Sequence, residues 1–326
     1  LNYILIYGKL GFPALKLRGA AIATAIAMVV QAVLLFVIGN AKKNIIHAPI
    51  GEFFKKDIEF FKKFLRVCAP IMLNELLWER HCTPVELAQI GQYAENVFFG
   101  KPCGLMDQTA SSVGGVVAID FADTAHPIVE RLDVDLHTCG YALCILDSGA
   151  GHEDLTGEYS AITEELRAVC RVFGKEVLRE VPEADFLAEL PHVRKAVGDR
   201  AVNRAFHVYG ENRRVREEVQ ALRSGDFQRF LTLVRESGRS SAMYLQNIIP
   251  TGSTAAQELM VTIALCERML EGRGAVRVHG GGFGGTAQAF VPLDMLDGFR
   301  DRVEASLGRG CCHVVRIRPA GGIRLG

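Results

Sequence analysis

Two carboxylic acids, Glu95 and Asp107, lie twelve residues apart in the sequence, separated by a turn that contains glycine and proline. Asp107 falls in the first turn of a predicted helix, where free N–H groups and the helix dipole favour a negative charge. We expect a tight turn over residues 100–104 to bring both carboxylates to one cleft, where one holds Mg²⁺ and the other faces a hydroxyl group. The alternative is structural, because aspartate in a first helical turn commonly acts as a cap.

A run of glycines surrounds Phe283 over residues 280–285. This composition predicts a close approach of two backbone segments or a loop whose N–H groups face an anion, and a tight β-turn is the structural alternative. The run differs from a P-loop, because no Gly-Lys-Ser/Thr follows it. It also differs from the dinucleotide fingerprint, because no long helix clearly starts there.

The elements that must position these residues are a mixture of helices and strands. A capping box with proline, Thr83 to Glu86, predicts a helix that ends at Gly100, and a second helix is expected to run to Gly114. The remaining predicted strands are 116–121, 141–147, 276–279, 288–291 and 312–317, and the remaining predicted helices are 158–173, 194–209, 211–223, 226–236 and 254–270. The mixture predicts an α/β or α+β domain.

The composition is that of a globular protein, with 49% hydrophobic and 23% charged residues in a chain of 326. The net charge is zero, which argues against a nucleic-acid partner. Nine cysteines without a C-x-x-C pair favour a reducing compartment over a disulfide framework or a zinc site. Residues 1–78 nevertheless carry ten basic and four acidic side chains, so the two parts of the chain differ in kind.

The first 78 residues have the pattern of a membrane protein. Residues 19–39 are uncharged and long enough to span a bilayer core, with basic residues on both sides. Residues 51–66 predict an amphipathic helix suited to a membrane surface. The alternatives are a buried helix for the first segment and an amphipathic helix of a water-soluble protein for the second.

This part resembles the multidrug and toxin extrusion (MATE) family of transporters. The resemblance is carried by residues 2–7 (NYILIY), 17–24 (LRGAAIAT) and 69–75 (APIMLNE). It implies the end of one transmembrane helix, the next helix, the connection between the two halves and the start of a further helix. It covers about a fifth of such a transporter.

Residues 83–326 resemble the galactokinases, within the GHMP small-molecule kinases. The matching segments are 92–96 (QYAEN), 100–108 (GKPCGLMDQ), 155–159 (LTGEY), 204–207 (RAFH), 211–212 (EN), 237–238 (SG), 245–247 (LQN) and 277–286 (RVHGGGFGGT). The resemblance implies a GHMP-kinase-like two-layer α/β domain that transfers the γ-phosphoryl group of ATP to the C1 hydroxyl of D-galactose. Residues 79–326 would form this catalytic portion, incomplete at its N-terminal side and preceded by the membrane segment.

The resemblance also implies roles for individual residues. Asp107 matches the catalytic carboxylate and Glu95 matches the glutamate that binds Mg²⁺. Gly104 and Tyr159 match positions that contact the sugar. The glycine run matches the third motif of the family, which implies ATP-binding positions at Gly280, Gly281, Gly282, Gly284 and Gly285. We expect a monomeric, cytoplasmic kinase portion, tethered to a membrane if residues 1–78 insert.

The chain departs from the galactokinase pattern before residue 83. The family's sugar-binding segment and its P-x-G-x-G-L-S-S-S phosphate loop are not found in these 326 residues, so we expect impaired phosphoryl transfer. Three interpretations remain: a galactokinase portion, a membrane antiporter fragment with a non-functional tail, or a chimera of two genes joined near Trp78. Galactokinase is the functional interpretation that the larger part of the chain favours.

Overall fold

The computed structural model describes residues 82–98, 100, 103–151 and 155–322, all within the second of two compact units, Leu77–Gly326. The predicted membrane segment, residues 1–78, lies outside the described residues, so its spanning helix and its amphipathic helix stay predictions. Within the described part of the chain, no helix has both the length and the apolar character needed to cross a bilayer.

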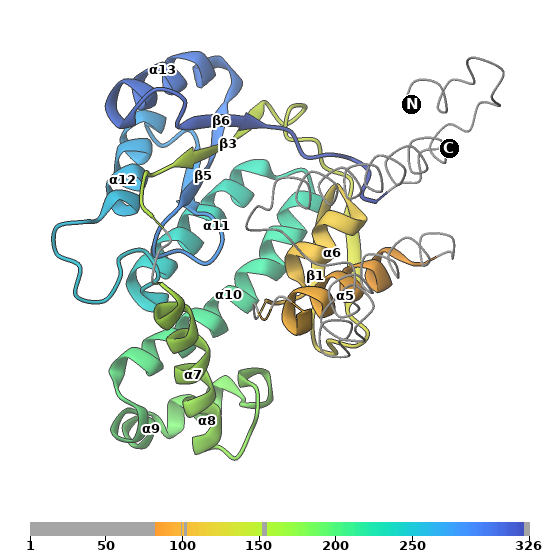
Figure 1. Cartoon of the computed structure of the whole chain (residues 1–326), viewed down its shortest axis with the longest axis vertical. Coiled ribbons are helices and arrows are strands. Elements are labelled where there is room, and N and C mark those ends of the chain that lie inside the picture. The colour runs from red at the N-terminus through yellow and green to blue at the C-terminus, as the bar shows by residue number, and fades with distance from the viewer. Residues whose placement is uncertain (1–81, 99, 101–102, 152–154, 323–326) are drawn as a thin grey trace, which may run out of the picture. The chain divides into compact units, whose positions relative to one another are not determined.

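The described elements are a mixture of helices and strands, as the sequence predicts (Figure 1). In chain order they are α5 (Pro84–Tyr93), the π-helical turn η1 (Ala94–Phe98), α6 (Met106–Val113), β1 (Val116–Asp120), β2 (Ile128–Leu132), β3 (Tyr141–Asp147), α7 (Thr156–Val172), η2 (Leu178–Glu180), α8 (Glu183–Ala188), α9 (Leu190–Val197), α10 (Asp199–Arg223), α11 (Phe227–Ser240), η3 (Ser241–Leu245), α12 (Glu258–Leu270), β4 (Ala275–Val278), β5 (Thr286–Pro292), η4 (Leu293–Met295), α13 (Leu296–Leu307) and β6 (Cys312–Val315).

The main sheet has four antiparallel strands in the order β4-β5-β3-β6. Alternate side chains point to opposite faces, so β3, β4 and β5 each contribute to two cores. One face packs on α12 and α13 through residues such as Cys144, Ala289 and Phe299. The other face packs on α11, where Phe227 contacts Phe290. The sheet therefore lies between helices on both faces, rather than in the two layers that the sequence led us to expect.

A second core is entirely helical and lies among α7, α8, α9 and α10 (Figure 1). Phe186 is completely buried there, and its ring meets the rings of Phe206 and Tyr209. The predicted break between helices at Gly210 is wrong, because α10 is continuous from Asp199 to Arg223. Gly210 is buried within it, and the guanidinium of Arg214 lies 3.3 Å from where a Cβ of Gly210 would be. Gly210 therefore lies inside α10, beside a side chain of the same helix, and does not end it.

The segment that carries the predicted catalytic residues comprises α5, η1, α6 and the hairpin β1–β2. The capping box of α5 is confirmed: Glu86 N–H donates to Thr83 Oγ1 at 3.2 Å, and Thr83 N–H donates to the Glu86 carboxylate at 2.7 Å. Strand β1 is where the sequence predicts it, whereas its partner β2 was not predicted. Helices α5 and α6 pack against each other.

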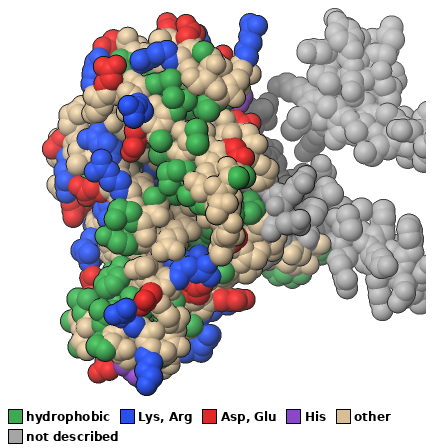
Figure 2. All heavy atoms as spheres, turned by 90° about the vertical axis from the view of Figure 1, so that its left-hand side faces the viewer, with side chains coloured by type: hydrophobic (Ala, Val, Ile, Leu, Met, Phe, Trp, Pro, Cys, Tyr) green, Lys and Arg blue, Asp and Glu red, His purple; other side chains and the backbone are tan. Residues whose placement is uncertain are grey.

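The surface carries charges of both signs. Figure 2 shows lysine and arginine side chains interspersed with aspartate and glutamate over one face, with hydrophobic side chains between them. Such a mixed face lacks the single-sign field that attracts a polyanion.

Candidate active site

Glu95 lies in the π-helical turn η1, which continues α5 and brings this carboxylate opposite the start of α6. π-Helical turns are rare in proteins, and those that occur are often found at functional sites. Asp107 is the second residue of α6, in its first turn, and its side chain is exposed. The N-cap of α6, Leu105, makes no side-chain cap, so the amide groups at this helix end have no hydroxyl or carboxylate cap from that position.

The connection between the two carboxylates is held by Asn96. The side-chain oxygen Oδ1 of Asn96 accepts the backbone N–H of Cys103 at 2.7 Å, and its side-chain nitrogen Nδ2 donates to the backbone carbonyl of Cys103 at 3.3 Å. Gln92 donates to the same carbonyl at 3.2 Å. Three side-chain hydrogen bonds therefore hold Cys103, just before α6, against the end of α5 and η1. They keep the segment that carries Glu95 close to the start of α6.

Gln108 links the two carboxylate-bearing segments directly. Its amide nitrogen donates to the Glu95 carboxylate at 3.4 Å, across thirteen residues of sequence. Its carbonyl oxygen is buried and has no hydrogen-bond partner. The structure thus brings Glu95 into contact with Gln108, the residue next to Asp107, and leaves one unsatisfied acceptor on Gln108. That the two carboxylates share one cleft stays a prediction.

Tyr159, on α7, lies against the glycine run rather than beside Asp107. Its hydroxyl donates to the carbonyl of Gly282 at 2.7 Å, and its ring meets the ring of Phe283 edge-on at 5.5 Å. A Cβ at Gly281 would lie 2.7 Å from the Tyr159 ring. Burial raises the pKa of Tyr159, so the hydroxyl keeps its proton for this hydrogen bond at neutral pH.

The glycine run makes a close approach to a neighbouring segment, which is one of the alternatives that its composition predicts. Gly282 has φ +85°, and a Cβ there would overlap the carbonyl oxygen of Asn247. The same oxygen accepts the N–H of Phe283 at 2.5 Å, and the Asn247 side-chain amide donates to Gly281 at 3.0 Å. The Gly285 carbonyl accepts from Ser148. Asn247 and Ser148 thus hold the glycine run in place through several of its backbone groups.

Two separate groups of predicted site residues result. No hydrogen bond, ion pair or ring contact between described residues joins Glu95 or Asp107 to Tyr159 or the glycine run. Gly104 is exposed, and a Cβ there would meet nothing within 4 Å, so packing does not require a glycine at that position.

The structure adds positioning roles that pattern alone did not assign. Asn96 and Gln108 tie together the carboxylate segments, while Asn247 and Ser148 hold the glycine run. All but Ser148 lie within motif segments of the sequence, which was the available signal. Their partners are set by the fold, so spacing alone could not identify them.

The comparisons with known proteins point to one class. The sequence model for the GHMP kinases N terminal domain matches residues 66–115, which include Glu95 and Asp107. That match overlaps residues 66–78, which we assigned to the membrane segment, and the domain boundary near residue 78 stays a prediction.

By fold, the chain is similar to the crystal structure of Lactococcus lactis galactokinase complexed with galactose. The TM-score is 0.60 at 23% identity, over 81% of this chain and 66% of that one. The chain therefore resembles the GHMP kinases, which are phosphotransferases.

Within that class the similar sequences are galactokinases. The chain is 32% identical to the galactokinase of Glaesserella parasuis serovar 5 over 215 residues, which is 66% of this chain and 53% of that protein. It is 36% identical to the galactokinase of Thermotoga neapolitana over 235 residues, which is 70% of this chain and 62% of that protein. The chain thus spans about half the length of the curated relatives it matches. None of these comparisons concerns a transporter, so the MATE resemblance stays a prediction.

Proposed function

We propose that the described part of this chain is the portion of a galactokinase-type enzyme that carries the catalytic carboxylate, and that its reaction is the ATP-dependent phosphorylation of D-galactose at the C1 hydroxyl. The observation that carries the proposal is the Gln108–Glu95 contact at the start of α6. It joins two carboxylate-bearing segments inside the stretch that matches the GHMP kinases.

Asp107 is the group that would orient the C1 hydroxyl and accept its proton. Asp107 is exposed in the first turn of α6, where the helix dipole and the free N–H groups favour a negative charge. An anionic oxygen within hydrogen-bond reach of a hydroxyl can take its proton as the phosphoryl group arrives. Gly104 and Tyr159 would contact the sugar, as their positions in the motifs imply.

The residues near Glu95 fit a magnesium ion that arrives with ATP. Among the described residues there is no group of three or more His, Cys, Asp or Glu side chains that would hold a metal alone. Mg²⁺ needs no such group, because one or two carboxylates commonly hold it together with phosphate oxygens and water. The buried Gln108 oxygen without a partner lies beside Glu95 and suits a bound water of that shell. The ion would neutralise charge on the transferring phosphoryl group.

The glycine run would support the phosphates of ATP. Among the described residues no hydrogen bond occupies the amide N–H groups of Gly280, Gly281, Gly282 and Gly284. The amides of Phe283 and Gly285 are different, because they donate to Asn247 and Ala150. A partly occupied glycine loop can offer its remaining N–H groups to an anion.

We further propose that the 326-residue chain by itself transfers the phosphoryl group poorly. Phosphoryl transfer depends almost wholly on positioning and charge neutralisation, and no P-x-G-x-G-L-S-S-S segment is present in the sequence as printed. The membrane antiporter alternative rests on residues 1–78, outside the described residues.

The test is the formation of galactose 1-phosphate from galactose and MgATP, followed by ³¹P NMR. We expect no turnover above background with the chain as it stands. A hybrid should turn over when the N-terminal part of the Thermotoga neapolitana galactokinase replaces residues 1–65, which precede the matched segment. Turnover by the unmodified chain would show that the phosphate loop is dispensable. A folded but inactive hybrid would count against galactokinase chemistry.

A further inference from the structure

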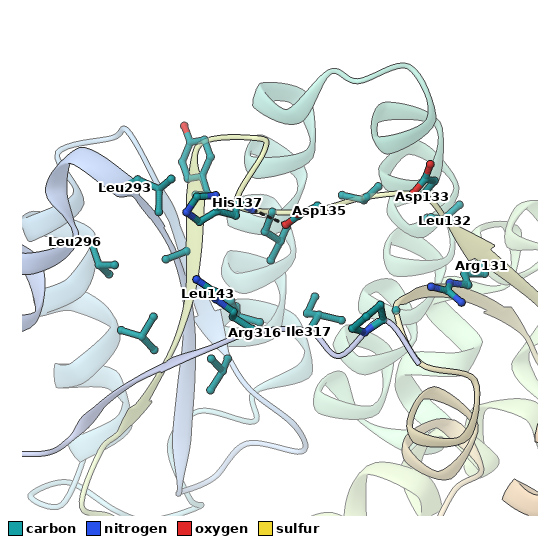
Figure 3. A pocket seen from close by; sticks show the side chains of 18 residues that line it. Arg131, Leu132, Asp133, Asp135, His137, Leu143, Leu293, Leu296, Arg316 and Ile317 are labelled. Carbon is teal, nitrogen blue, oxygen red and sulfur yellow. Dashed lines mark hydrogen bonds between the residues drawn. The ribbon is translucent and has the colours of Figure 1, made fainter. Parts of the chain in front are cut away.

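A cavity of about 580 Å³ lies at the start of β3, and none of the predicted catalytic, sugar-binding or ATP-binding residues lines it. Its walls come from the end of β2, the connection 133–140, strand β3, the region 293–296 and the segment that follows β6. Figure 3 shows Leu143 on β3, with Leu293 and Leu296 on one side of the strand and Ile317 on the other.

The cavity exists because the chain leaves the sheet after β6. Strand β6 pairs with β3 over Leu143–Leu146 only, so residues 141–142 pair only with β5. After Val315 the chain runs to the end of α6, where Gly115 N–H donates to the carbonyl of Arg318 at 2.8 Å. The cavity occupies the space between β3 and the segment that follows β6.

The lining is more apolar than polar, and leucine, valine and isoleucine are half of its residues. Leu136, Leu143, Val315 and Ile317 are among them. Ligand sites are typically cavities of about 300–1,000 Å³ with apolar walls and a few polar groups, and this cavity has that size and composition. The ligand that suits such walls has an apolar body.

Two arginines give the cavity a preference for a negatively charged ligand. Arg131 and Arg316 line it, and neither forms an ion pair or a side-chain hydrogen bond with another described residue. Gly115, with φ +72°, makes room for one of them, since a Cβ there would lie 2.9 Å from Arg131 Nε. A guanidinium binds carboxylate, sulfonate and phosphate groups through paired N–H donors.

Two aspartates and a histidine also face this cavity. The Asp135 carboxylate accepts the backbone N–H of His137 at 2.9 Å, so part of its hydrogen-bonding capacity is used locally. The Asp133 carboxylate points away from Arg316 in Figure 3. The arginine and aspartate side chains of the lining are exposed, so water screens their charges. We expect the apolar walls to supply most of the affinity and the arginines to select the sign of the ligand.

We propose that this cavity binds a small amphiphilic anion, with its apolar body between β3 and residues 315–319 and its acidic group at Arg131 and Arg316. The site is separate from the proposed kinase chemistry, because its lining shares no residue with it. Its occupation does not depend on whether the chain phosphorylates galactose.

The test uses the full chain and two fluorescent probes of similar shape. The first, 8-anilinonaphthalene-1-sulfonate, carries an acidic group, and the second, N-phenyl-1-naphthylamine, lacks one. We expect saturable binding of the sulfonate at one site per chain. Arg316→Gln should weaken the sulfonate about threefold to fivefold and leave the neutral probe unchanged. Arg309→Gln, an exposed arginine outside the cavity, is the matched control and should change neither.

A second pair of variants tests the apolar wall. Ile317→Asp places a carboxylate in the wall and should weaken both probes by tenfold or more. Val215→Asp on α10 is the matched control, since Val215 and Ile317 are each 41% exposed and Val215 does not line the cavity. Both variants should melt cooperatively, because each changes a partly exposed side chain. Probe binding that never saturates, or that Ile317→Asp and Arg316→Gln leave as in the parent chain, would overturn the proposal.

Discussion

Replacing Gly282 by alanine tests how the glycine run is held. Gly282 has φ +85°, a backbone conformation that costs a non-glycine residue about 1–2 kcal/mol. The added Cβ would also overlap the carbonyl oxygen of Asn247, a backbone atom that cannot move alone. Overpacking of this kind typically costs about 1–3 kcal/mol. We therefore expect Gly282→Ala to lower the free energy of unfolding by about 2–5 kcal/mol.

Gly280→Ala is the matched control, because it separates the two contributions. Gly280 has φ +70°, but a Cβ there would meet nothing within 4 Å. Only the backbone cost applies, about 1–2 kcal/mol. The assay is urea denaturation followed by circular dichroism, with the slope of each transition compared to confirm one kind of unfolding. Equal destabilisation by the two alanines would refute the inference that Asn247 closes on Gly282.

The overlap should also disturb the hydrogen bond from Tyr159 to Gly282. Tyr159→Phe removes that bond and should cost about 0.5–1.5 kcal/mol in the parent chain. In a Gly282→Ala background the same change should cost less, because the carbonyl has already shifted. Strict additivity in this double-mutant cycle would mean that the two residues act independently.

Three further changes have outcomes that the structure sets. Burial and the nearby Glu211 raise the pKa of Glu218 to about 7, so the ionised side chain costs folding free energy that increases from pH 4.5 to pH 7 and stays constant at higher pH. Glu218→Gln should therefore stabilise the chain by up to about 3 kcal/mol at pH 8 and by little at pH 4.5. An equal gain at both pH values in urea denaturation would contradict this. Thr83→Ala removes the capping box of α5 and should cost about 1 kcal/mol by thermal melting, whereas Thr124→Ala, exposed in a loop, should cost almost nothing. In the active hybrid, Glu95→Gln should raise the Mg²⁺ concentration that half-saturates turnover, because an amide is a poorer ligand for a hard cation, and an unchanged Mg²⁺ dependence would remove Glu95 from the metal site.

Local sequence signals predicted some elements with accurate bounds and missed others, such as helix α13. The capping box placed the start of α5 at Pro84, because its two hydrogen bonds join residues three apart. Buried apolar runs placed β3 at Tyr141–Asp147, the same bounds as in the structure. Strand β2 was missed, since its burial alternates poorly and only Leu132 is buried.

The site contacts depend on residues that are far apart in the chain. The Tyr159 hydroxyl reaches Gly282 across 123 residues, and Asn247 reaches Gly281 across 34. A motif predicts that such residues matter, but only the packed fold decides which atoms meet. The cavity at the start of β3 was equally hidden, because it depends on where the chain leaves β6.

The central claim is that Asp107 is the carboxylate that accepts the galactose hydroxyl proton. The measurement that tests it most directly is the turnover of the hybrid enzyme with and without Asp107→Asn, at saturating galactose and MgATP. The amide keeps the shape of the side chain but cannot take the proton, so kcat should fall by about 10²-fold or more. Thermal melting should change little, because Asp107 is exposed. Near-normal turnover by the Asp107→Asn hybrid would contradict the claim.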